Sequence, residues 1–156
     1  MKTLLILTGK TTDKNIAAGI ADYTSRISHY MPFELTVIPE LKNTKSLTHE
    51  QQKEREGELI LKQIQQADFV VLLDEHGKEY RSVEFASWLQ HKQHTAKRLA
   101  LVMGGPYGFS DAVYKRADEK VSLSKMTFSH QMVRLIITEQ IYRACTIIKG
   151  EPYHHE

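Results

Sequence analysis

The sequence is poor in the features that mark cross-linked, fibrous and membrane proteins. Its one cysteine, Cys145, cannot form an internal disulfide, which excludes a disulfide-rich scaffold. No run of 18 apolar residues occurs, so no membrane-spanning helix is expected. The first residues lack the length and the small-residue cleavage site of a signal peptide. We therefore expect a cytoplasmic protein without a membrane partner.

The net charge is small, and its excess lies near one end. The chain has 156 residues, 41% hydrophobic and 26% charged, proportions typical of one folded domain over residues 1–156. The whole net charge of +2 comes from residues 112–156, which hold seven basic and five acidic groups. This asymmetry favours an anionic partner near the C-terminus, although an ordinary solvated surface would give the same count.

Common motifs for nucleotide, hydrolytic and metal chemistry are absent. Gly9-Lys10-Thr11 resembles the end of a phosphate-binding loop, but Leu4 stands where that motif needs its first glycine. Neither the dinucleotide fingerprint G-x-G-x-x-G nor the serine-hydrolase motif G-x-S-x-G occurs. The histidines lack zinc-site spacing, and one cysteine cannot complete such a site, so no metal is expected.

Short apolar segments alternate with segments of helical periodicity. The apolar runs predict buried strands at about residues 4–7, 34–38, 69–73, 99–103 and 121–123. The periodic segments predict helices at about residues 12–30, 48–66, 82–89, 110–116 and 130–148, with Thr12 and Thr48 capping the first two. Residues 74–77 are expected to form a loop. This alternation predicts an α/β fold, with a mostly parallel sheet covered by helices on both faces.

Apolar side chains surround the last predicted helix instead of forming one stripe. Met132, Ile136, Ile141 and Ile147 are among them. A helix that covers one face of a sheet needs only one apolar stripe, so this helix is expected to have two buried faces. We predict a homodimer through this helix. The alternative is that a loop or another helix of the same chain covers the second face.

Three polar or glycine-rich loops follow predicted strands, at residues 74–80, 104–110 and 124–129. Ligands of parallel α/β sheets bind beyond the carboxyl ends of the strands, so these loops are expected to form one pocket. The paired glycines Gly104 and Gly105 permit a close backbone approach to a flat ligand, and a tight strand-to-helix turn is the alternative. The tail from Tyr153 to His155 is either a frayed terminus or an arm folded over that pocket.

Several motifs follow one another in the second half of the chain. They are L-A-L-V-M-G-G-P-Y-G at 99–108, L-S-K-M-T-F at 123–128, H-Q-M-V-R at 130–134, E-Q-I-Y-R-A at 139–144 and P-Y-H at 152–154. In this order and spacing, the chain closely resembles the bacterial ribosomal large-subunit RNA (pseudouridine N3)-methyltransferases of the SPOUT superfamily. The resemblance runs from the first strand to the tail.

This resemblance implies a SPOUT-type α/β fold with a C-terminal trefoil knot, and an obligate homodimer. It implies S-adenosylmethionine as methyl donor and N3 of a pseudouridine in 23S ribosomal RNA of the assembled ribosome as acceptor. The implied cofactor-binding residues are Leu73, Gly104, Leu123, Ser124, Lys125, Met126, Thr127 and Phe128. The implied RNA-binding residues are His130, Arg134, Arg143 and Tyr153, and the implied catalytic residues are His154, Tyr153 and Arg143.

Within this implied site, Tyr153 would stack on the target base, and His154 would hold or remove the imide proton, with proximity alone as the alternative. Two positions depart from the family pattern. Ser129 replaces a common proline but can cap the last helix, whereas His155 replaces a basic residue and would weaken a phosphate contact at neutral pH. A non-catalytic α/β dimer that binds RNA or the ribosome is the alternative function.

Overall fold

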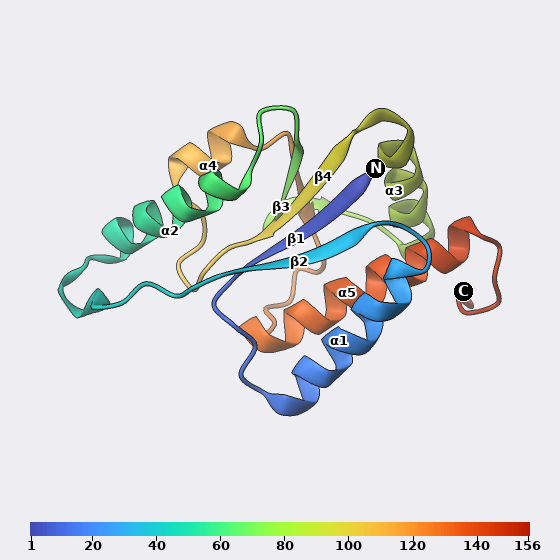
Figure 1. Cartoon of the computed structure of the whole chain (residues 1–156), viewed down its shortest axis with the longest axis horizontal. Coiled ribbons are helices and arrows are strands. Elements are labelled where there is room, and N and C mark those ends of the chain that lie inside the picture. The colour runs from blue at the N-terminus through green and yellow to red at the C-terminus, as the bar shows by residue number, and fades with distance from the viewer.

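A computed structural model describes residues 1–156, and five parallel strands form its centre in the order β2-β1-β4-β3-β5 (Figure 1). The strands are β1 (Lys2–Thr8), β2 (Phe33–Ile38), β3 (Phe69–Glu79), β4 (Arg98–Met103) and β5 (Glu119–Ser122). β1, β4 and the first half of β3 (residues 69–73) are largely apolar because helices cover both of their faces. The predicted parallel α/β architecture is confirmed.

Helices α1 (Lys14–Ser28), α3 (Ser82–Thr95) and α5 (His130–Ile148) cover one face of the sheet, and α2 (His49–Gln63) and α4 (Asp111–Arg116) cover the other (Figure 1). Alternate residues of one strand therefore enter different cores. Leu5 belongs to the α1–α3–α5 side, whereas Leu4 and Ile6 belong to the α2–α4 side. A short 3-10 helix, Thr44–Ser46, precedes α2.

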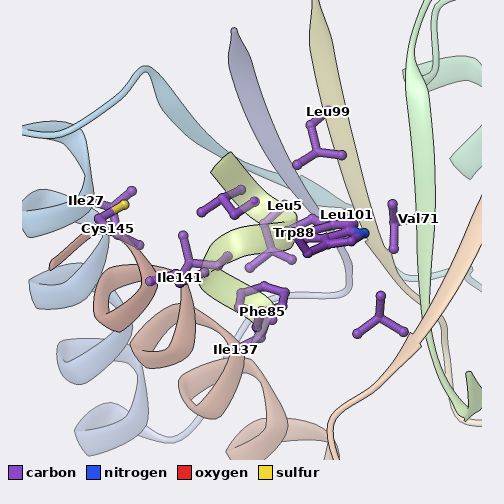
Figure 2. Packing of buried hydrophobic residues seen from close by; sticks show 14 of the residues in the cluster. Leu5, Ile27, Val71, Phe85, Trp88, Leu99, Leu101, Ile137, Ile141 and Cys145 are labelled. Atoms are coloured by element: carbon purple, nitrogen blue, oxygen red, sulfur yellow. The ribbon is translucent and has the colours of Figure 1, made fainter. Parts of the chain in front are cut away.

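The larger core lies between the sheet and α5, which packs between α1 and α3. Figure 2 shows strand residues such as Leu101 facing Trp88 on α3 and Ile137 and Ile141 on α5. The flanking helices bury much of the apolar surface of α5. The alternative explanation for the apolar character of this helix, cover by helices of the same chain, thus accounts for a large part of it.

Side-chain caps fix where the helices begin. Thr48 and Gln51 form the predicted capping box at the start of α2. Ser129 accepts a hydrogen bond from the backbone of Met132 and caps α5, so serine supports the helix at this position. The first helix is capped by Asp13 instead of the predicted Thr12, because the Asp13 carboxylate accepts two backbone N–H groups.

The prediction of a loop at residues 74–77 is wrong, because β3 continues through this segment to Glu79. Val121 of β5 pairs first with Leu73 and then with Lys78, so β3 makes an excursion away from β5 and returns to it. Gly77 permits the return, since a Cβ atom there would lie 2.6 Å from the backbone of Lys120 and Val121. The excursion pushes residues 74–76 outward at the end of the sheet.

None of the helices combines the length and apolar character that a membrane span requires.

Candidate functional site: a cavity at the carboxyl ends of the strands

A cavity of about 520 Å³ lies beyond the carboxyl ends of β3 and β4 and next to the end of β5. Its walls come from the three segments expected to converge, namely the β3 excursion, the glycine loop (residues 104–108) and residues 123–128. Val133 and His130 from the start of α5 complete it. The volume falls within the range of roughly 300–1,000 Å³ that is typical of small-molecule sites.

Most residues of the predicted cofactor set line this cavity. Leu73, Leu123 and Phe128 give apolar walls, and Met126 lies at the mouth, 75% exposed. Gly104, Ser124 and Thr127 also line it. Lys125 does not line the cavity, because its side chain is 87% exposed and lies 3.9 Å from Glu79.

One wall of the cavity is acidic and belongs to the segment 74–80, which was expected to line the pocket. Asp74 and Glu75 of the β3 excursion line it together with His76 and Tyr114. The Tyr114 hydroxyl donates a hydrogen bond to Asp74 Oδ2, and burial together with this carboxylate raises the pKa of Tyr114 to about 12. The sequence signal for Tyr114 is its place four residues after Ser110, the N-cap of α4, which directs the ring back toward the strand ends.

The glycine loop closes another wall with its main chain. Gly108 N–H donates to the Gly105 carbonyl at 3.2 Å, and Gly108 has a φ of 85°, a left-handed conformation that glycine adopts without strain. The loop is therefore both the tight turn and the backbone wall that were considered as alternatives. Tyr107 at its tip stacks on His49 of α2, with ring centroids 3.9 Å apart.

His130 stands at the rim of the cavity, at the first residue of α5. Surrounding protein atoms and the nearby Arg134 charge lower the pKa of His130, and a hydrogen bond with the Gly105 backbone partly opposes this. A lowered pKa keeps the imidazole neutral near pH 7. His130 is thus suited to a neutral hydrogen bond at this rim, more than to an ion pair with phosphate.

The structure gives Arg134 a different role from the predicted contact with RNA. This residue is 4% exposed. Its guanidinium donates to the carbonyls of Thr8 and Gly9 at 2.7 and 2.9 Å, and to Thr11 Oγ1 at 3.1 Å. All three acceptors belong to the end of β1 and the following loop, so Arg134 fastens α5 to β1. We do not retain it among the RNA-binding candidates.

The other predicted RNA-binding and catalytic residues form a second cluster near the C-terminal end of α5. Glu139 Oε1 accepts hydrogen bonds from Arg143 at 2.6 Å and from the Tyr153 hydroxyl at 3.0 Å. Burial raises the pKa of Tyr153, and its bonds with Tyr23 and Glu139 add to this effect. The Arg143 guanidinium lies over the Tyr153 ring at 4.8 Å and within 3.1 Å of His154 Nδ1. The tail is therefore folded, not frayed.

The contact between Arg143 and His154 indicates which ring nitrogen of the neutral His154 imidazole carries the hydrogen atom. A guanidinium can only donate, so Nδ1 of His154 accepts, and in the neutral ring the hydrogen lies on Nε2. This Nε2 atom is buried and has no partner within the chain. A buried donor without an acceptor costs free energy in the folded protein.

The tail does not lie over the cavity of its own chain. Tyr153 is held by Glu139, nine residues along α5 from His130 at the cavity rim. At 1.5 Å per residue this places the tail roughly 14 Å further along the helix axis. Within one chain, the cavity and the tail cluster are therefore separate.

The structure contains no group of three or more His, Cys, Asp or Glu side chains placed to hold a metal ion.

Comparisons with known proteins place this geometry in a family. A family model described as "Predicted SPOUT methyltransferase" matches residues 1–154. The ribosomal RNA large subunit methyltransferase H of Bacteroides fragilis is 62% identical, and the protein of the same name from Flavobacterium johnsoniae is 54% identical. Each alignment covers 100% of both chains.

Among solved structures, the tRNA (m1G37) methyltransferase of Aquifex aeolicus matches with a TM-score of 0.58 over 99% of this chain and 75% of that chain. Its sequence identity is 14%, so this likeness concerns the fold alone. The family model and the relatives, by contrast, match nearly the whole sequence, and they confirm the resemblance inferred from the motifs. The chain belongs to the SPOUT methyltransferase family.

Proposed function

We propose that this chain methylates N3 of a pseudouridine in 23S ribosomal RNA of the assembled large subunit, with S-adenosylmethionine as the methyl donor. The cavity between the glycine loop and residues 123–128 is the observation that carries this proposal. The names of the relatives support the class of substrate. Residues 1–156 would act as one domain in the cytoplasm, where ribosomes work, and the trefoil knot stays a prediction of the family resemblance.

The residues around the cavity fit such a cofactor. Leu73, Leu123 and Phe128 offer apolar surface for a purine ring, while main-chain groups of the glycine loop can pair with its polar edge. The carboxylates of Asp74 and Glu75 suit the ammonium group of a methionine moiety. When bound, S-adenosylmethionine supplies an electrophilic methyl group. The apolar walls of the chain exclude water from its surroundings.

The distance between the cavity and the tail favours a homodimer as the working unit. A two-fold dimer through α5 would bring the tail of one protomer to the cavity of the other. Met132 and Ile136, on a side of α5 not fully covered by α1 and α3, are available for such a contact. His154 of the partner subunit would then reach the cavity of this chain, and its unpaired Nε2–H would find an acceptor.

In this arrangement the tail positions the target base. The Tyr153 ring stacks on it, and His154 donates from Nε2 to one of its carbonyl oxygens, because Nδ1 is already engaged by Arg143. Arg143 also provides positive charge next to the backbone of the RNA. With Nδ1 engaged by Arg143, His154 would position the base and would not remove the N3 proton, so catalysis would depend mainly on proximity.

Two measurements test this proposal. Calorimetry should detect binding of S-adenosylmethionine to the purified protein, and mass mapping of 23S ribosomal RNA from a deletion strain should show one pseudouridine without its methyl group. Restoring the gene should restore the methyl group. Ribosome binding without any affinity for S-adenosylmethionine would instead support the non-catalytic alternative, and an unchanged methylation map would remove the proposed substrate.

A further inference from the structure

Helix α2 contacts the glycine loop at two points and the start of α4 at a third, although it contributes nothing to the cavity lining. The ring of His49 stacks on Tyr107 at the tip of the loop. Gly57 lies directly against Ser110, where the loop leads into α4. Between these two contacts, Glu56 meets Gly105, since a Cβ atom built on this glycine would lie 2.6 and 2.7 Å from the two carboxyl oxygens. Helix α2 is therefore the support on which the loop rests.

The carboxyl group of Glu56 is buried without adequate hydrogen bonds. The residue is 5% exposed, and its Oε1 atom has no hydrogen-bond partner. Burial raises the pKa of Glu56, and only the side chain of Gln52 opposes this shift. A buried acceptor without a donor costs free energy in the folded protein. The protein keeps this group beneath the one loop that forms the backbone wall of the cavity.

We propose that Glu56 is a positioning residue of the cofactor site, whose carboxylate accepts a hydrogen bond from the Gly105 N–H when the cofactor is bound. This inference rests on the proposed function. The trans peptide between Gly104 and Gly105 points its N–H and its carbonyl in opposite directions. Fixing the N–H toward Glu56 therefore turns the Gly104 carbonyl into the cavity, where it can accept from the amino group of an adenine.

The groups around Gly105 favour its N–H as the donor to Glu56. The next peptide ends at Pro106, which has no N–H and cannot compete for the carboxylate. On the other side of the loop, His130 makes a hydrogen bond with the Gly105 backbone. Gly105 thus lies between Glu56 of α2 and His130 of α5. These two contacts would define the orientation of the loop from both sides.

Two substitutions at Glu56 test the proposal in the full-length protein. Glu56→Met removes the acceptor at similar volume, and Glu56→Gln keeps one neutral acceptor. We expect the dissociation constant for S-adenosylmethionine to rise roughly 10- to 100-fold in Glu56→Met and roughly 5-fold in Glu56→Gln, as expected for lost and weakened charge-assisted bonds. Glu58→Gln, an exposed position on the same helix, is the matched control and should leave the affinity unchanged.

A positioning role predicts a particular combination of results. The melting temperature of the cofactor-free variants should stay equal or rise, because an unpaired buried carboxyl is removed. The KM for S-adenosylmethionine should rise while the KM for ribosomes stays constant. Affinity within two-fold of wild type in Glu56→Met, or a loss that follows a lowered melting temperature, overturns the inference. If the wild-type protein itself fails to bind S-adenosylmethionine, the proposed function fails instead.

Discussion

At its first residue α5 borders the cavity, whereas its C-terminal part and the tail form a closed polar cluster. The cavity has main-chain walls and carboxylates, and a buried acceptor without a donor, Glu56 Oε1, lies beneath its glycine loop. In the tail cluster, Glu139, Arg143 and Tyr153 satisfy one another, and His154 Nε2 is the one buried atom without a partner. A region with unpaired polar groups is ready for a ligand, while a region with internal pairs holds a fixed shape. One end of the helix is thus suited to binding, and the other to presenting a rigid surface.

Removing the tail should distinguish the roles of the two ends of α5 most clearly. A chain that stops after Pro152 lacks Tyr153 and His154 but keeps every cavity residue. We expect ribosome methylation to fall roughly 10²- to 10⁴-fold, the usual contribution of such positioned groups, while the affinity for S-adenosylmethionine stays the same. Steady-state rates and calorimetry measure the two effects. Unchanged turnover would show that the tail takes no part in the reaction.

Arg134 tests whether the cavity end depends on α5 being fastened to β1. Arg134→Met leaves the carbonyls of Thr8 and Gly9 without donors, and we expect a loss of roughly 3 kcal/mol in the free energy of unfolding. Urea unfolding measures this loss. Arg26→Met, an exposed arginine paired with Asp22, is the control and should cost less than about 1 kcal/mol. Normal stability with weaker RNA binding would return Arg134 to the RNA-binding residues.

Filling the cavity should affect binding without affecting the tail cluster. Gly104→Val places branched carbons against the Phe109 ring, whose atoms lie 3.1–3.3 Å from a Cβ built at this position. The resulting crowding costs about 1–3 kcal/mol, so the affinity for S-adenosylmethionine should fall roughly 10- to 100-fold. Gly104→Ala should show a smaller loss in the same calorimetric titration. If both variants bind S-adenosylmethionine as tightly as the wild type does, the cofactor site lies elsewhere.

The smallest expected effect concerns Cys145, in the dry interior near the tail end of α5. Burial raises the pKa of Cys145 to about 12, so the folded protein keeps the thiol while the unfolded chain loses its proton near pH 9. Stability should therefore decline as the pH rises above that of the unfolded thiol. Between pH 8 and 9.5, the wild type should lose roughly 1 kcal/mol more in unfolding free energy than Cys145→Ala. Identical losses would mean that water reaches this sulfur.

Local patterns were sufficient for most of the fold because its strands are buried on both faces. The apolar runs at Leu4–Leu7 and Leu99–Met103 have no other place in a domain of this size. The same rule failed at Asp74–Gly77, where polar residues continue a strand because β5, more than forty residues later, pairs with both sides of them. That pairing is a long-range contact that no local periodicity can reveal.

The cavity could be predicted to the level of its loops, since the ends of parallel strands meet at one edge. Individual side chains were harder. Arg134 looks like any basic residue until its acceptors, 123 to 126 residues away, are known. Glu56 is one of several charges on a helix that looks solvated, and only the packed structure shows it beneath Gly105. The tail residues were identified through family resemblance, and their contact with a cavity is part of the proposed homodimer.

The excursion of β3 gives the cavity one wall that is fixed on both sides. Because Leu73 and Lys78 both pair with β5, the wall formed by Asp74 to His76 is anchored on its two sides and does not act as a mobile lid. Residues 123–128 lie beyond the end of β5, outside the sheet, and Met126 there is exposed. A ligand that needs the cavity to widen would therefore have to displace residues 123–128, and not the wall formed by Asp74 to His76.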